Sequence, residues 1–137
     1  MSKNIFIACD TNKTSAAQKI IKYSNTKKLK IGYKFGLEFI NSKNGRSFIS
    51  KIKDKIIFAD LKLHDIPNTC ASAVKAIKDL KVNYLTIHVS SGLEALKAAK
   101  RVSGKIKLAG VTTLTSIDNY SLRQIGYDKK LKKLRSM

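Results

Sequence analysis

Acidic residues, proline and cysteine are scarce in this sequence of 137 residues, and long apolar runs are missing. Proline occurs once, at Pro67, and no low-complexity stretch or linker divides the chain, so we expect one domain over residues 1–137. The sequence has no run of 18 uncharged apolar residues, so no membrane-spanning helix is predicted. Residues 1–10 lack the longer apolar region and cleavage site of a secretory signal.

The two cysteines, Cys9 and Cys70, form no CxxC pair and lie near no metal-like cluster of residues. This usage is typical of a protein kept in a reducing compartment. We therefore expect a cytoplasmic protein whose cysteines hold no metal.

The shortage of acidic residues leaves nine Asp and Glu against 28 Lys and Arg, a formal net charge of +19. Such a charge is compatible with nucleic-acid binding. Lysine far outnumbers arginine, however, and is spread along the chain, mostly at positions expected on polar helix faces. Nucleic-acid binders more often gather Arg and Lys together with exposed aromatic side chains. The composition therefore disfavours a nucleic-acid partner.

Short apolar runs rich in Ile and Val alternate with segments of helical spacing. Such runs are typical of buried parallel strands, and the alternation predicts βαβ units with a parallel sheet. An open doubly wound sheet and a (β/α)₈ barrel both fit; a barrel needs about 250 residues, so the pattern alone favours the open sheet. The expected strands are residues 4–9, 29–32, 56–61, 84–89 and 107–112. The expected helices are residues 14–23, 35–52 with a break at 41–45, 68–80, 93–102, 117–125 and an exposed start at 128–137.

The sharpest signal is the sequence FADLKLHDIPNT at residues 58–69. Asp60 and Lys62 are two positions apart in a predicted strand, so their side chains point to the same face. In a barrel that face is the interior, where charges are costly unless they are paired. Asp65 follows just past the strand, at the end where barrel enzymes place catalysis. A surface salt-bridge cluster is the plainer interpretation, but it does not explain charges on an inward face.

Two more charges have comparable positions on the first two predicted strands. Asp10 ends the first strand, although a strand-terminal Asp is often only a helix cap. Lys30 lies within the second. The charges of this set alternate in sign along the chain: Asp10, Lys30, Asp60, Lys62 and Asp65. His88, which ends the fourth strand, is interpreted as a structural, hydrogen-bonded histidine.

Residues 60–69, DLKLHDIPNT, resemble the signature of the orotidine 5′-monophosphate decarboxylases, a DxKxxD core with an IPNT continuation. The resemblance covers nearly the whole chain and implies an α/β fold of the (β/α)₈ TIM-barrel family. This chain would hold about the first five βα units, an incomplete barrel, so the preference for an open sheet is reversed. Supporting stretches are ACD at 8–10, LKIG at 29–32, TIHVSSG at 86–92 and GVTTLTS at 110–116.

The resemblance implies conversion of orotidine 5′-monophosphate (OMP) to UMP and carbon dioxide in pyrimidine biosynthesis, without metal or organic cofactor. Lys62 would protonate the pyrimidine carbon as carbon dioxide leaves. Lys30 would hydrogen-bond the ribose and Asp60, and Asp60 would face the orotate carboxylate. The further residues that the resemblance places at the substrate are Asp10 at the ribose hydroxyls, Asp65 and Thr69 across a homodimer interface, Ile66, and Thr115 with Ser116 at the pyrimidine.

The chemistry accounts for these residue types. Decarboxylation leaves a carbanion-like centre, which a fixed ammonium stabilises more in the transition state than in the substrate. Asp60 and Asp65 would hold Lys62 protonated and oriented.

The chain departs from the family in length, because the late strands with their phosphate-binding loops have no counterpart in it. We therefore expect the isolated chain to be inactive or poorly folded unless a separate carboxy-terminal half completes it. A related phosphosugar decarboxylase or aldolase is the first alternative, but it would require a magnesium-binding carboxylate and a different continuation after Asp65. A basic, non-enzymatic protein that binds RNA or a partner chain is the second.

Overall fold

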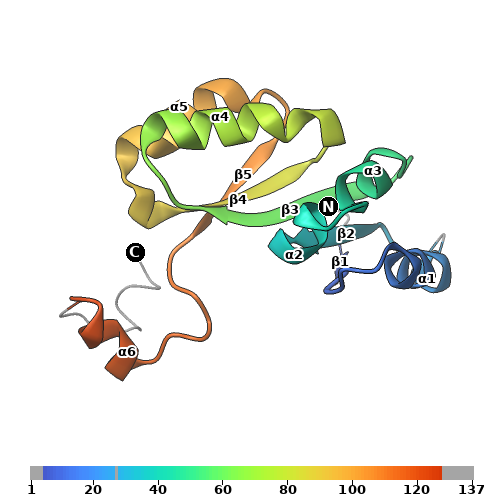
Figure 1. Ribbon diagram of the computed structural model, residues 1–137, viewed down its shortest axis with the longest axis horizontal. Helices are drawn as coiled ribbons and strands as arrows, with labels where there is room; N and C mark the ends of the chain where they lie inside the picture. Colours follow the sequence, from blue (N-terminus) through green and yellow to red (C-terminus); the bar gives the residue numbers. More distant parts are fainter. Residues whose placement is uncertain (1–4, 27, 128–137) are drawn as a thin grey trace.

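The computed structural model describes residues 5–26 and 28–127. In this part of the chain the strands form one parallel sheet, and helices connect them (Figure 1). Its order is β1-β2-β3-β4-β5, so each strand pairs with the next one along the chain. A doubly wound sheet would reverse its strand order, whereas a barrel keeps it sequential. The prediction of a partial (β/α) barrel is therefore confirmed. The strands are β1 (Ile5–Ala8), β2 (Ile31–Gly36), β3 (Ile56–Leu63), β4 (Tyr84–His88) and β5 (Lys107–Val111).

Helices connect the strands, and right-handed crossovers between neighbouring parallel strands place such helices on one face of a sheet. Figure 1 shows α4 and α5 lying side by side across β3 to β5, while α6 lies apart, beyond an extended connection from β5. The predicted helices are confirmed, but residues 128–137 lie outside the described residues. The helices are α1 (Thr14–Ser24), α2 (Leu37–Asn41), α3 (Gly45–Ser50), α4 (Pro67–Ala76), α5 (Leu93–Ser103) and α6 (Asn119–Gln124), with short 3₁₀ turns η1 (Lys78–Leu80) and η2 (Val89–Ser91).

The hydrophobic core lies between the helices and one face of the sheet. Tyr33, Phe35 and Leu85 on this face are completely buried. The Tyr33 hydroxyl lies 3.0 Å from Ser24 Oγ and donates to the backbone carbonyl of Ile21 at 3.3 Å, which fixes α1 against β2. Because side chains alternate along a strand, Lys34 between Tyr33 and Phe35 points to the opposite face. None of the helices in the described part of the chain is long and apolar enough to cross a membrane.

The opposite, inward face carries an aromatic layer. The ring of Phe6 meets those of Phe58 and Tyr84 edge-on, with centroids 5.2 and 5.3 Å away. Gly32 leaves room for this layer, since a Cβ there would lie 2.6 Å from the Phe6 ring and 2.9 Å from the Ile56 carbonyl. Phe58 and Tyr84 precede Asp60 and Thr86 by two residues, so the layer lies just amino-terminal to the polar residues of the same face.

The second strand differs from its prediction. It was expected at residues 29–32 with a helix from residue 35, but β2 is Ile31–Gly36 and α2 begins at Leu37. The prediction ended the strand at Gly32, so Tyr33 and Lys34 were left outside it and Phe35 was assigned to the helix. In β2 only one face packs against helices, and polar or small residues therefore alternate with buried aromatic ones.

Candidate active site

Asp60 is the centre of the charged cluster. It lies in β3 and is 9% exposed. Its Oδ2 accepts from Lys34 Nζ at 2.9 Å, and its Oδ1 lies 2.9 Å from Lys62 Nζ. Thr86 Oγ1, from β4, donates to the same Oδ1 at 3.0 Å. Three neighbouring strands thus supply two ammonium groups and one hydroxyl to a single carboxylate, and the cluster keeps a net positive charge.

Lys62 reaches Asp60 from an irregular piece of strand. The β3–β4 pairing shifts register between Ala59 and Leu63, which is a bulge. Lys62 has φ +48°, in the left-handed region that L-residues with side chains seldom adopt. The backbone N–H of Lys62 donates to Thr86 Oγ1 at 2.8 Å instead of to the partner strand's backbone. The bulge therefore aims the ammonium across the carboxyl end of the sheet.

Asp60 and Lys34 shift each other's pKa values. Burial alone would raise the pKa of Asp60, but the hydrogen bonds from Lys34, Lys62 and Thr86 together outweigh it and hold that pKa below its ordinary value. The hydrogen bond to Asp60 raises the pKa of Lys34 against the opposing effect of burial, and the carboxylates of Asp60 and Asp10 add to this rise. Carboxylate and ammonium are thus both ionised at neutral pH.

The lowered pKa of Asp60 predicts a pH dependence of stability. A carboxylate with a depressed folded-state pKa adds stability above its unfolded-state pKa, and this is lost as pH falls through the folded-state value. We expect Asp60→Asn to lower the free energy of unfolding by about 1–3 kcal/mol at pH 7, and the difference from the unmodified chain to shrink below about pH 4. Urea unfolding between pH 7 and pH 2.5 measures this. The exposed Asp54 forms no ion pair within the described residues and gives the control Asp54→Asn. An Asp60→Asn difference that stays constant with pH would contradict the assignment.

Lys30, which the sequence placed beside Asp60, lies elsewhere. It precedes β2 and is exposed, and its backbone carbonyl accepts from the N–H of Ile5. Gly36 is the residue opposite Asp60, and a strand rises about 3.3 Å per residue, so Lys30 starts roughly 20 Å away along β2. The predicted contact between Lys30 and Asp60 is therefore wrong, and Lys34 makes this contact instead. Within residues 29–36 the Lys-x-Gly pattern occurs twice, at 30–32 and 34–36, and the alternation with buried aromatic residues singles out the second.

The other predicted residues on the β1 and β3 loops lie around this cluster without joining its hydrogen bonds. Asp10 follows β1 and is exposed, and its charge acts on Lys34. Asp65 Oδ1 accepts from its neighbour's N–H, that of Ile66, at 2.7 Å. Within the described residues Asp65 forms no ion pair with Lys62, so in one chain only Asp60 holds that ammonium. Ile66 and Thr69 are exposed at the start of α4.

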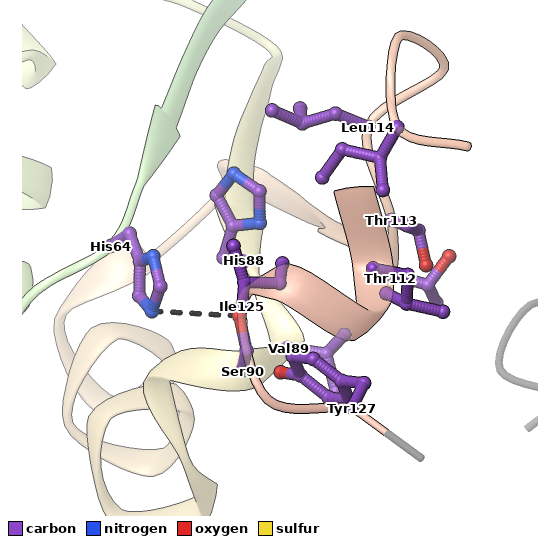
Figure 2. Close-up of a pocket in the computed structure, with 11 residues that line it drawn as sticks. His64, His88, Val89, Ser90, Thr112, Thr113, Leu114, Ile125 and Tyr127 are labelled. Atoms are coloured by element: carbon purple, nitrogen blue, oxygen red, sulfur yellow. Dashed lines mark hydrogen bonds between the residues drawn. The ribbon is translucent and has the colours of Figure 1, made fainter. Parts of the chain in front are cut away.

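A cavity of about 600 Å³ lies beyond the carboxyl ends of β4 and β5. Figure 2 shows His64 and His88 on one side of it and Thr112 and Thr113 on the other. Thr115 and Ser116 are exposed in the segment after β5 and do not line it. The residues that line it are His64, His88, Val89, Ser90, Thr112, Thr113, Leu114, Ile117, Leu122, Ile125 and Tyr127.

Two histidines form the polar wall of this cavity. The rings of His64 and His88 lie 5.0 Å apart at 32°, and His64 Nε2 is 3.4 Å from Ser90 Oγ. Burial lowers the pKa of His88, and the charges of His64 and Lys62 lower it further. The His88 side chain makes no hydrogen bond to another described residue, so the hydrogen bond predicted for it is not seen there. No group of three or more His, Cys, Asp or Glu suited to a metal ion occurs in that same part of the chain.

Comparisons with known proteins agree with this geometry. The "Orotidine 5'-phosphate decarboxylase" of Wolbachia sp. subsp. Brugia malayi is 41% identical over 133 residues, which is 93% of this chain and 57% of that protein. The protein of the same name from Ehrlichia canis is 48% identical over 100 residues, 70% of this chain and 43% of its own length. The chain thus spans about half the length of the curated relatives it matches.

Solved structures show the same fold. The crystal structure of orotidine 5'-phosphate decarboxylase from Lactobacillus acidophilus matches with a TM-score of 0.87 at 28% identity, over 97% of this chain and 63% of that one. The orotidine 5'-monophosphate decarboxylase from Methanocaldococcus jannaschii, complexed with the inhibitor BMP, matches with a TM-score of 0.70 at 26% identity, over 82% and 53%. The model of the orotidine 5'-phosphate decarboxylase / HUMPS family matches residues 3–135, and the chain belongs to this family.

Proposed function

We propose that this chain contributes the decarboxylating groups of an orotidine 5′-monophosphate decarboxylase. The observation that supports this most is the Asp60 carboxylate held between Lys34 and Lys62 at 2.9 Å on each side. Two ammonium groups against one carboxylate leave an unbalanced positive charge at the carboxyl end of the sheet, where barrel enzymes act. Such a preorganised charge is suited to stabilising a developing carbanion.

In the proposed reaction the bond between the pyrimidine ring and its carboxylate breaks, and carbon dioxide leaves without the electron pair. That pair stays on the ring carbon, which takes a proton from Lys62 Nζ. Lys62 then recovers a proton from solvent. Asp60 orients the Lys62 ammonium beforehand, because its Oδ1 lies 2.9 Å from Lys62 Nζ.

The nucleotide would lie across the carboxyl ends of the strands. Asp10 would bind the ribose hydroxyls from the end of β1, and Lys34 would take the ribose contact that the resemblance implied for Lys30. The cavity beside His88 has a volume usual for ligand sites and lies next to the segment that holds Thr115 and Ser116, the proposed pyrimidine contacts. The Methanocaldococcus relative was solved in complex with the inhibitor BMP, which supports the proposal that this fold binds a ligand.

We further propose that the chain works as one domain within an assembly in the cytoplasm. Asp65 and Thr69 are exposed at the start of α4, beside Ile66, which is 65% exposed. These positions suit contacts with the substrate of a second copy in a homodimer. The edge strands β1 and β5 would accept a separate carboxy-terminal half that extends the sheet.

The test is calorimetric titration of the purified chain with 6-hydroxy-UMP, together with carbon dioxide release from OMP. We expect 6-hydroxy-UMP to bind more tightly than UMP, because its anionic ring resembles the carbanion. Light scattering on the same sample reports the assembly. Turnover of a phosphosugar with magnesium, and none of OMP, would favour the related phosphosugar enzymes instead. A folded chain that binds neither nucleotide in any assembly would contradict the proposal.

A further inference from the structure

Thr86 lies at the junction of the two groups proposed to act in decarboxylation. It occupies the middle of β4, on the inward face, and is 6% exposed. Its Oγ1 accepts from the backbone N–H of Lys62 at 2.8 Å and donates to Asp60 Oδ1 at 3.0 Å. A hydroxyl has one proton, which Thr86 donates to Asp60, and its oxygen still has a lone pair that accepts the backbone N–H of Lys62. One side chain thus fixes the orientation of both neighbours.

The bulge in β3 explains why such a link is needed. Ala59 pairs with Leu85 and Leu63 with Ile87, so residues 60–62 stand opposite Thr86 alone. The regular ladder has no acceptor for the Lys62 N–H there, and an unsatisfied backbone N–H is costly. The left-handed backbone of Lys62, at φ +48°, adds strain that the surroundings must offset. The Thr86 hydroxyl replaces the missing ladder acceptor.

We infer that Thr86 is a positioning residue, which holds the bulge of Lys62 and the carboxylate of Asp60 in one geometry. The catalytic part of this inference rests on the proposed function, whereas the structural part does not. Thr86 reaches substrate only through Lys62 and Asp60. The other charged groups that face this cluster are Lys34, paired with Asp60, and Asp10, which acts on Lys34.

The test compares Thr86→Val with Thr86→Ser in the full chain. Valine keeps the branched shape and removes the hydroxyl, and serine restores it. In Thr86→Val we expect the Lys62 amide to exchange with deuterium about tenfold faster, since a hydrogen bond to it is lost. The pKa of the Asp60 carboxyl, followed by NMR, rises, because one of its donors is removed. Thr86→Ser recovers most of both effects.

Ser103→Ala is the matched control, because Ser103 is 1% exposed and its hydroxyl donates to the Lys100 carbonyl in α5. It removes a buried hydroxyl of equal kind, and we expect no change at the Lys62 amide or the Asp60 carboxyl. Thr86→Val should also lower kcat about tenfold with less effect on KM. A folded wild-type chain that shows no turnover and binds neither nucleotide would contradict the proposed function alone, because amide exchange and the Asp60 titration still report on Thr86. Wild-type values for both in Thr86→Val would overturn the inference.

Discussion

Lys62→Ala is expected to reduce the release of carbon dioxide from OMP by at least about 10³-fold. General acid catalysis contributes roughly 10²- to 10⁴-fold, and loss of one preorganised charge removes a further 10²- to 10³-fold. The fold should survive, because Asp60 keeps Lys34 and Thr86 as partners. Turnover and thermal unfolding of the same preparation separate the two effects.

The matched control is Lys100→Ala, an exposed lysine in the last turn of α5. It removes an equal charge far along the chain from the cluster and should leave turnover unchanged. A Lys62→Ala chain that keeps a tenth of the wild-type rate would exclude Lys62 as the proton donor. Equal losses in both variants would instead point to the overall positive charge as the cause.

Lys34→Met is expected to lower kcat/KM about 10²-fold or more, whereas Lys30→Met should stay close to wild type. Lys34 Nζ is 2.9 Å from Asp60 Oδ2, and its side chain is 29% exposed, so its loss leaves that oxygen without its charged donor. Hydrogen bonds to charged groups contribute about 1.5–3 kcal/mol, so urea unfolding should also detect Lys34→Met. Lys30 is exposed and precedes the strand.

The paired variants decide between the two Lys-x-Gly tripeptides at residues 30–32 and 34–36. Both substitutions remove one ammonium and keep a long apolar chain, so the net charge of the protein falls equally. An activity loss confined to Lys30→Met would mean that the site is assembled in another register of β2. If neither variant lost activity, the ammonium of Lys34 would have no part in the proposed mechanism.

The positions of most strands could be predicted from the sequence, because these strands consist mainly of apolar residues. The runs that became β1, β3, β4 and β5 matched their predictions to within two residues at either end. The DxKxxD core predicted the carboxylate and ammonium of β3, since two charges in a buried strand require partners. Strand order then separated the barrel from the open sheet, which the pattern alone had favoured.

The partners of Asp60 were harder to predict, because they come from other strands. Lys34 was missed because the predicted strand ended at Gly32, four residues before the end of β2. Thr86 looked like an ordinary strand residue, since threonine is common in strands. The bulge at Lys62 depends on the register between β3 and β4, which no local pattern in either strand reveals.

The sequential strand order also sets when the charged cluster becomes complete during synthesis. Each strand pairs with one made about 25 residues earlier, so every step closes a loop of similar length and similar entropic cost. A growing chain can therefore add its units from the amino terminus as they leave the ribosome. Asp60 and Lys62 gain their hydroxyl partner only when β4 delivers Thr86. A nascent chain that has not yet reached β4 would thus leave Asp60 and the Lys62 N–H without this hydroxyl.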